Sequence, residues 1–426
     1  MNGSPTAAND KMNKRVLLIA FHFPPQAGSS GIQRTLSFSR HLDGHGWRPM
    51  VLSAHPRAYS TQNPTQLAAI PAHVLVQRPF ALDTKRHMGF RGRYLQMMAL
   101  PDRFVSWWFG AIPAGMSLIR QHRPQVLWST FPVATAHLIG LTLHRLSGLP
   151  WIADFRDPML QPTHPTQPLS RAVYRWIERQ AIERCRFAVF TTESALRSYR
   201  ERFPHIDPAK FVVIENGYEE EEFGRLADSA VQQERPHGGP ITLLHSGVLY
   251  DDGRNPAPFL AALAGMKSSG KVAAGSLRVI LRAPGDVEET SAMVLAHGVE
   301  DIVEVLPPVP YREALNEMMG ADGLLVFQGT PFNSQVPAKI YEYFRARKPV
   351  LGLVDPAGET ATVLRRAGFT QLAQTDDKEQ ITQALERFLL EIRNGSAYIA
   401  TDEVVEQAAR AHKARQLSQL FDSAAG

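Results

Sequence analysis

The sequence predicts an α/β protein with two Rossmann-like, doubly wound parallel-sheet domains that face a cleft. Three observations support this prediction. Apolar runs of strand length alternate with segments whose apolar residues recur at helical spacing. The alternation stops between residues 219 and 240 and then restarts. The chain of 426 residues, 44% hydrophobic and 20% charged, is long enough for two or three domains with buried cores.

The first predicted domain covers residues 14–218 and follows a segment, 1–13, that we expect to be disordered. It opens with a strand, a glycine-containing loop, a helix and a second strand, which is a β-loop-α-β unit. Uninterrupted apolar runs of this kind are typical of parallel strands that are buried on both faces. The expected strands are 15–21, 48–53, 125–129, 151–154, 187–191 and 211–215, and the expected helices are 32–42, 133–146 and 169–184.

The second predicted domain covers residues 241–400 and follows a polar linker, 219–240. Its expected strands are 241–246, 277–281, 303–306, 323–327 and 349–354, and its expected helices are 258–266, 288–297, 311–319, 360–366 and 378–392. We expect residues 401–426 to form a C-terminal helix that packs back on the first domain. Because doubly wound sheets bind ligands beyond the carboxyl ends of their strands, the cleft between the domains is the predicted site.

Composition narrows the function classes. The formal net charge of +5 is spread along the chain, which suits an anionic ligand or an acidic membrane face better than nucleic acid. The single cysteine, Cys185, excludes an intramolecular disulfide and a cysteine-based zinc site and favours a reducing compartment. Residues 1–13 do not resemble a signal peptide, and the apolar run 16–23 is too short to span a bilayer. We therefore expect a cytoplasmic protein, with contact to the inner face of the plasma membrane left open.

One segment, residues 80–115, departs from the alternation because it combines basic and aromatic residues. Such a mixture suits peripheral contact with a membrane or lipid. Alternatively, the segment is an insertion whose aromatic side chains pack into the core. The residues concerned are Arg86, Arg91, Arg93, Trp107, Trp108 and Phe109.

The strongest candidate site lies in residues 333–350, between two predicted buried strands. Ser334 or Gln335 could cap a helix there, with a proline in its first turn, and the free N–H groups at a helix start bind anions. Lys339 adds a positive charge where a diphosphate would lie. Glu342 follows on the same helix face and could accept hydrogen bonds from both ribose hydroxyls. The alternative is an ordinary solvated Lys–Glu pair on a surface helix.

This segment resembles the signature of the large retaining glycosyltransferase family 4, which includes sucrose synthase and many bacterial exopolysaccharide and lipopolysaccharide transferases. That signature has two glutamates seven residues apart, before an Ala-x-Gly-x-Pro-Val run. Glu342 matches the second, which grips the nucleotide ribose, whereas Gln335 stands in place of the first. An amide can still hydrogen-bond a sugar hydroxyl, but not as an anion.

The resemblance implies a GT-B fold and transfer of a hexose from a nucleoside diphosphate sugar with retention of configuration. UDP-sugars are favoured over GDP-sugars as donors, and the implied acceptor is a saccharide or a lipid-linked saccharide in bacterial surface polysaccharide biosynthesis. No metal or other cofactor is expected, because cations of the protein can stabilise the leaving diphosphate.

Two glycine-containing loops add donor-binding candidates. The loop 22–34 contains Gly28 and Gly31, and glycine allows the backbone to approach a phosphate closely. The family has a Gly-rich loop at this place, near the donor phosphates and the acceptor. The loop 246–256 contains Gly247 and Arg254. In the family it supplies a basic residue to the diphosphate, and a guanidinium suits phosphate oxygens. Either feature could instead be an ordinary surface loop.

The catalytic candidates are Asp154, Arg156 and Asp157, which follow a predicted strand at the cleft edge. The family usually places a His-Asp pair here, near the donor sugar. We expect Asp154 or Asp157 to contact donor or acceptor hydroxyls. A buried Asp–Arg pair that holds the loop is the alternative.

Two other functions remain open. A nucleotide-sugar epimerase can share the two-domain architecture, but it would need acid and base carboxylates around the sugar. A catalytically degenerate nucleotide-binding protein would explain Gln335 and the missing His-Asp pair. The Lys339 and Glu342 pattern favours the transferase over the epimerase.

Overall fold

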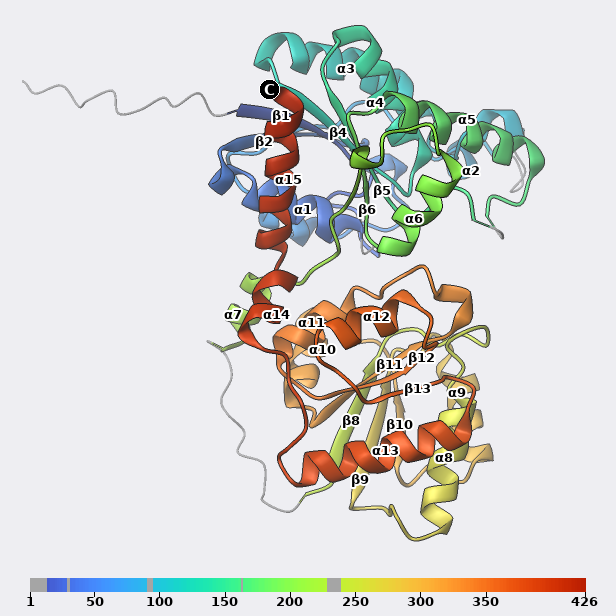
Figure 1. Cartoon of the computed structure of the whole chain (residues 1–426). Coiled ribbons are helices and arrows are strands. Elements are labelled where there is room, and N and C mark those ends of the chain that lie inside the picture. The colour runs from blue at the N-terminus through green and yellow to red at the C-terminus, as the bar shows by residue number, and fades with distance from the viewer. Residues whose placement is uncertain (1–13, 29–30, 90–94, 162–163, 228–238) are drawn as a thin grey trace, which may run out of the picture. The chain divides into compact units, whose positions relative to one another are not determined.

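The computed structural model describes residues 14–28, 31–89, 95–161, 164–227 and 239–426, which form two compact units (Figure 1). The first unit comprises residues 1–215 and 410–426, and the second comprises residues 216–409. Each unit contains one parallel sheet with helices on both faces. The two sheets confirm the predicted class of two Rossmann-like, doubly wound domains.

The sheet of the first unit has seven parallel strands in the order β3-β2-β1-β4-β5-β6-β7. The order reverses direction between β1 and β4, which is the switch point where doubly wound sheets bind ligands. The strands are β1 (Lys14–Ile19), β2 (Trp47–Leu52), β3 (Leu75–Gln77), β4 (Val126–Thr130), β5 (Trp151–Arg156), β6 (Phe187–Phe190) and β7 (Phe211–Val213).

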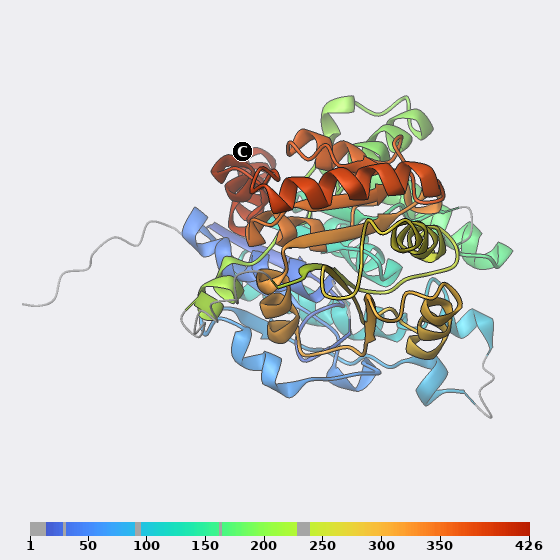
Figure 2. The same cartoon turned by 90° about the horizontal axis from the view of Figure 1, so that it is seen from below.

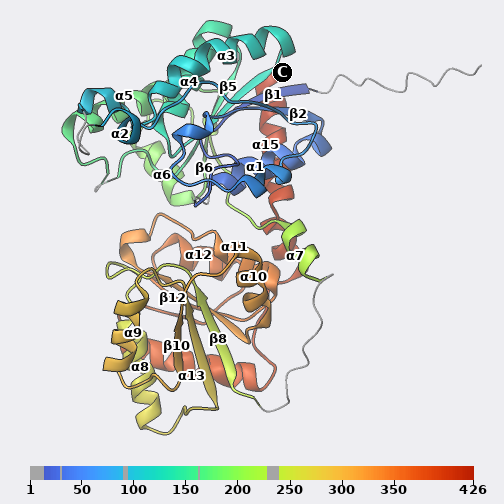
Figure 3. The same cartoon turned by 180° about the vertical axis from the view of Figure 1, so that it is seen from behind.

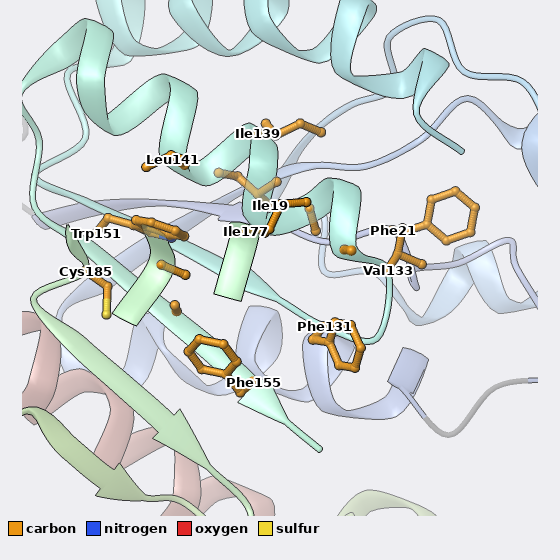
Figure 4. Packing of buried hydrophobic residues seen from close by; sticks show 14 of the residues in the cluster. Ile19, Phe21, Phe131, Val133, Ile139, Leu141, Trp151, Phe155, Ile177 and Cys185 are labelled. Atoms are coloured by element: carbon orange, nitrogen blue, oxygen red, sulfur yellow. The ribbon is translucent and has the colours of Figure 1, made fainter. Parts of the chain in front are cut away.

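The helices of this unit cover the two faces of the sheet because successive strand side chains point to opposite faces. Along β1, Leu17 and Ile19 join one core, and Val16 and Leu18 join the other. The larger core lies under α3 to α6 and includes Trp151, as Figure 4 shows. The helices are α1 (Gly31–His41), α2 (Thr84–His87), α3 (Ser106–His122), α4 (Ala134–Ser147), α5 (Pro168–Arg184), α6 (Glu193–Arg202) and α15 (Arg410–Ala425).

The last helix, α15, belongs to the first unit although the chain reaches it from the second. It packs beside α1, and its Phe421 ring meets Trp47 at 5.2 Å between centroids. Asp422 accepts a hydrogen bond from Trp47 Nε1 at 3.0 Å and forms an ion pair with Lys14 at 2.7 Å. The predicted helix at 401–426 is in fact two helices, because Ala409 is extended and ends α14 (Asp402–Ala408), which lies in the second unit.

The sheet of the second unit repeats the topology with six parallel strands in the order β10-β9-β8-β11-β12-β13. Its switch point lies between β8 and β11. The strands are β8 (Ile241–Ser246), β9 (Leu277–Arg282), β10 (Val303–Leu306), β11 (Gly323–Gln328), β12 (Val350–Val354) and β13 (Leu372–Ala373).

Two cores again lie on opposite faces of this sheet. Leu324 and Val326 of β11 join the core under α10, α11 and α12, whereas Leu325 and Phe327 join the core under α8, α9 and α13. The helices can be followed in Figure 3, and Figure 2 shows α13 along one face of the sheet. Their bounds are α7 (Glu220–Ala227), α8 (Ala257–Ser268), α9 (Val287–Ala296), α10 (Tyr311–Gly320), α11 (Lys339–Ala346), α12 (Glu359–Arg366) and α13 (Lys378–Arg393).

The region predicted as a linker starts with structure of its own. Glu220 to Ala227 form α7, and Glu220 pairs with Arg345 of α11 at 2.6 Å. These residues therefore belong to the second unit, which begins at Asn216. Residues 228–238 lie outside the described residues. Within the part of the chain that the structure describes, no helix combines the length and apolarity that crossing a bilayer requires.

Candidate functional site

The switch point of the second unit carries most of the predicted donor-binding residues. Gly247 and Arg254 lie in the loop after β8, and Gln335 and Lys339 lie in the segment after β11. These two strands are neighbours in the sheet. Their following segments therefore leave the same sheet edge, where open α/β sheets bind ligands.

The two segments are tied together by hydrogen bonds. Gly329 N donates to Gly253 O at 2.6 Å, and Arg254 Nε donates to Gln328 Oε1 at 2.9 Å. Gln328 is buried at the end of β11, and its amide also donates to Phe332 O at 3.3 Å. These contacts hold the Arg254 guanidinium, which lies 4.8 Å from the centroid of the Phe332 ring.

Lys339 is the first residue of α11 and lies against Gly247. A Cβ at residue 247 would lie 2.6 Å from Lys339 Nζ, closer than real Cβ atoms come to another heavy atom. Gly247 also has φ of +139°, which side-chain-bearing residues rarely adopt. The backbone conformation therefore favours glycine here, and the missing Cβ leaves the space that the ammonium group occupies.

The cations at this edge lack full compensation. Burial and, to a smaller extent, the charge of Arg254 lower the pKa of Lys339 to about 7, although Glu342 opposes both effects. Burial also lowers the pKa of Arg254. The neighbouring His245 is buried, and desolvation together with the charge of Lys339 holds its pKa well below the usual value. A group of cations held in this way is ready for an anionic ligand.

Glu342 lies three residues after Lys339 on α11 and is partly exposed. Its Oε1 accepts a hydrogen bond from Tyr311 Oη at 2.7 Å, which orients the carboxylate. The predicted helix start is wrong, however. The N-cap is Ala338 in helical conformation, without a side-chain cap, so neither Ser334 nor Gln335 caps α11. The chain is still in a 3-10 turn and a loop at 330–338, and only then enters the helix.

Gln335 lies in that loop and contributes its backbone to the fold. Its carbonyl accepts hydrogen bonds from Thr360 Oγ1 at 3.1 Å and from Gln328 Nε2 at 3.4 Å. Its side-chain amide has no hydrogen-bond partner among the residues that the structure describes. The amide is thus available to a ligand.

In the first unit, the predicted catalytic residue Asp154 takes part in a buried ion pair. It is completely buried at the end of β5 and forms an ion pair with Arg34 of α1 at 2.9 Å. Arg34 donates to both carboxylate oxygens, and Thr130 Oγ1 donates to Oδ2 at 3.1 Å. With both oxygens occupied, Asp154 fits the alternative of a buried Asp–Arg pair, although its partner is Arg34 and not Arg156.

Arg156 and Asp157 follow at an irregular point of β5. The register with β6 shifts between Asp154 and Arg156, and Arg156 has φ of +56°. A bulge of this kind redirects the side chains that follow it. The Arg156 guanidinium lies against Gly31 at the start of α1, since a Cβ at residue 31 would lie 2.5 Å from Nη1. The structure thus brings Arg156 and Gly31 together.

Gly28 is exposed, has φ of +80° and has open space where a Cβ would lie. Its role in the fold is therefore the turn rather than a close approach. His22, six residues earlier, lies 3.4 Å from the position of a Cβ at Gly31. Its Nδ1 is 2.8 Å from Gln26 Oε1, and because an amide oxygen only accepts, Nδ1 carries the proton. Burial lowers the pKa of His22 to about 4, so its Nε2 is an acceptor at neutral pH.

In the basic and aromatic segment 80–115, some aromatic side chains pack into the core and another is exposed. Trp107 is completely buried in α3, and Trp108 Nε1 donates to Thr142 Oγ1 at 3.0 Å, so these aromatic side chains pack on the core. Phe109 is 66% exposed. Arg86 donates to Tyr59 O at 2.5 Å, and the other two basic residues, Arg91 and Arg93, lie outside the described residues.

Three polar residues of these sites, Gln328, His22 and Tyr311, were not among the candidates predicted from the sequence. Gln328 could have been found, because it is a polar residue at the end of an otherwise apolar strand at the ligand-binding edge. His22 follows three residues after the end of β1 and could have been found in a similar way. Tyr311 gave no signal, because nothing in its local sequence connects α10 with Glu342 thirty-one residues later.

Residues 20–217 match the family model of the glycosyl transferase 4-like domain. The chain therefore contains a glycosyl transferase 4-like domain over these residues, and its two-domain fold is of the GT-B class. No curated protein matches the chain by sequence.

Solved structures share its fold over nearly its whole length. Sucrose-phosphate synthase from Thermosynechococcus elongatus has a TM-score of 0.59 and 14% identity, over 97% of this chain and 96% of that chain. HepE from Anabaena, in complex with UDP-glucose, has a TM-score of 0.61 and 14% identity, over 96% and 99%. The N-terminal domain of trehalose-6-phosphate phosphatase from Candida albicans has a TM-score of 0.67 and 11% identity, over 100% and 99%. At these identities the likeness shows that the chain shares the fold of these proteins.

Proposed function

We propose that the chain is a retaining hexosyltransferase that uses a nucleoside diphosphate sugar, with UDP-sugars preferred. The observation that carries the proposal is the pair of cations at the switch point of the second unit, Lys339 and Arg254, with Glu342 one helical turn further on. The charge of Arg254 lowers the pKa of Lys339, so the two cations lie close enough to act on each other. A diphosphate would neutralise both.

In this proposal each group has one task. Lys339 and Arg254 stabilise the charge that develops on the leaving diphosphate, so the protein itself supplies the positive charge. Glu342, oriented by Tyr311, accepts hydrogen bonds from the ribose hydroxyls. The amide of Gln335 contacts a sugar hydroxyl. The acceptor hydroxyl attacks from the side of the leaving group, which retains the anomeric configuration, as the resemblance to family 4 implies.

The UDP preference is supported by HepE, which has been solved with UDP and with UDP-glucose. The proposed acceptor is a saccharide or lipid-linked saccharide of bacterial surface polysaccharide. Structures with the same fold include the lipopolysaccharide outer core galactosyltransferase WaaB and WaaG, a glycosyltransferase involved in lipopolysaccharide biosynthesis, with TM-scores of 0.59 and 0.53.

The donor assignment is tested by thermal shift with UDP, GDP, ADP and CMP and with their sugars. A ligand that binds only the folded chain raises the melting temperature. We expect one nucleoside diphosphate to stabilise the chain selectively. Glu342→Ala should weaken its binding about tenfold, since hydrogen bonds to a charged group contribute about 1.5–3 kcal/mol. Glu313→Ala, an exposed glutamate on α10, is the matched control and should change nothing.

Two results would contradict the proposal. If no nucleoside diphosphate shifts the melting temperature, the donor site is misassigned and a degenerate site becomes the better account. If the chain binds a UDP-sugar and converts it to an epimer, either as free sugar or still linked to UDP, without forming a glycosylated product, the chain is an epimerase. Product analysis by mass spectrometry with a bacterial lipid-linked saccharide extract separates these cases.

A lipid-linked acceptor also requires contact with a membrane, and the first unit has a suitable surface. Six apolar side chains between residues 80 and 109 are at least 38% exposed: Phe80, Met88, Leu95, Met97, Met98 and Phe109. Met97→Ser combined with Phe109→Ser should reduce co-sedimentation with vesicles of anionic lipid. The control is Leu295→Ser in the second unit, where the leucine is 65% exposed. Equal sedimentation of both variants would reject this contact.

A further inference from the structure

The guanidinium of Arg156 in the first unit has more hydrogen-bond donors than acceptors around it. Across the described ranges its only hydrogen bond runs from Nη1 to Phe131 O, at a long 3.5 Å. Its Nε is completely buried, and no described residue accepts from it. Because buried donors in folded proteins are almost always paired, this Nε–H group indicates an acceptor that the protein chain itself does not provide.

The backbone conformation at Arg156 also indicates a functional role. Its φ of +56° lies in the left-handed region, which glycine adopts without strain and arginine does not. The conformation is fixed by the shifted register between β5 and β6 and by Thr191, whose hydroxyl donates to Arg156 O at 2.8 Å. A strained residue that is not glycine suggests that its side chain has a task.

The surroundings of the guanidinium suit an anion. Nη1 lies at Gly31, the first residue of the eleven-residue helix α1, whose N-terminus carries a partial positive charge. The charges of Arg34 and Arg410 also act on Arg156. Two carboxylates oppose them, but Asp154 is already paired with Arg34. The other, Asp157, makes no hydrogen bond to Arg156 among the described residues.

We propose that Arg156 is the phosphoryl-binding residue of a subsite in the first unit, and that this subsite receives a phosphoryl group of the acceptor substrate. The assignment to the acceptor rests on the proposed function, in which Lys339 and Arg254 of the second unit already neutralise the donor diphosphate. The acceptor is then an anionic saccharide, such as a sugar phosphate or a saccharide linked to lipid through a phosphate. A donor diphosphate offers the same chemistry, so the experiment must distinguish the two sources.

The experiment measures the melting temperature of the full chain with inorganic phosphate, glucose 6-phosphate or UDP. The variants are Arg156→Gly, which removes the guanidinium and the backbone strain together, and Arg156→Gln. The matched control is Arg123→Gly, because Arg123 is exposed at the end of α3 and has a similar φ of +48°. Both glycine variants should fold at least as stably as the parent chain, which separates loss of binding from loss of folding.

We expect the Arg156 variants to bind phosphate and glucose 6-phosphate at least about tenfold more weakly, and to bind UDP as the parent does. The Arg123 control should respond like the parent to all three. Unchanged stabilisation by phosphate in both Arg156 variants would overturn the subsite. Loss of the UDP response together with the phosphate response would overturn the assignment to the acceptor and give the subsite to the donor. If the parent responds to phosphate but to no nucleoside diphosphate, the proposed function fails and the Arg156 subsite stands.

Discussion

The two units have the same strand order up to the last strand. They differ in whether the buried charges at the switch point have a partner of opposite charge. In the first unit, the buried Asp154 is matched by Arg34, and every oxygen and most donors of the pair are satisfied. In the second unit, the charge of Arg254 acts on Lys339 against that of Glu342, and the pKa of Lys339 is lowered to about 7. Compensated charge of the first kind supports a fold, whereas uncompensated charge of the second kind is suited to binding a ligand.

Removing the buried charge at the switch point should lower the stability of the first unit but not that of the second. The largest effect is expected in the first unit. Asp154→Ala should lower the free energy of unfolding by about 3–5 kcal/mol, because Arg34 would remain buried without its counter-charge. Urea denaturation measures the change. The control is Glu304→Ala, which breaks a pair with Arg278 that is about half exposed and should cost less than about 1 kcal/mol. Equal costs for the two variants would mean that burial does not distinguish these pairs.

The second prediction concerns Lys339, whose removal should weaken ligand binding without lowering the stability of the fold. Lys339→Met removes a poorly compensated cation, so the free energy of unfolding should stay the same or rise. The affinity for the nucleoside diphosphate should fall about tenfold or more, which corresponds to the 1.5–3 kcal/mol of a charged hydrogen bond. Titration calorimetry measures the affinity. Lys271→Met removes an exposed lysine of the same unit that pairs with Glu386, and it should leave the affinity unchanged.

The fold was predictable because each step depended on local pattern. The apolar runs 323–327 and 349–354 agree to within one residue with β11 and β12, because strands that are buried along their whole length are almost entirely apolar. The break at Ala409 was not predictable. Residues on either side of it are good helix formers, and the chain turns there because α14 packs in the second unit and α15 in the first.

The site was predictable as a set of positions but not as a set of contacts. The sequence placed Gly247, Arg254 and Lys339 after strands of one sheet, and the structure gives Gly247 and Lys339 direct contact. The partner of Asp154 could not be found in this way, because Arg34 is 120 residues away and Arg156 was the nearer candidate. Ion pairs between distant segments depend on helix placement, which periodicity does not determine.

The last prediction concerns pH and the charge of Lys339. Burial lowers its pKa from 10.5 to about 7, so between pH 7 and 10.5 the unfolded chain binds a proton that the folded chain does not. Stability of the unliganded chain should therefore rise with pH across this window, because the cost of burying the charge is present in full below pH 7 and is relieved above it. A bound diphosphate favours the charged form, so its affinity should fall as pH rises from 7 to 9, by at most about tenfold per unit. In Lys339→Arg the guanidinium stays charged, and this dependence should vanish. A parent chain whose affinity is flat over the same range would show that Lys339 does not contact the phosphates.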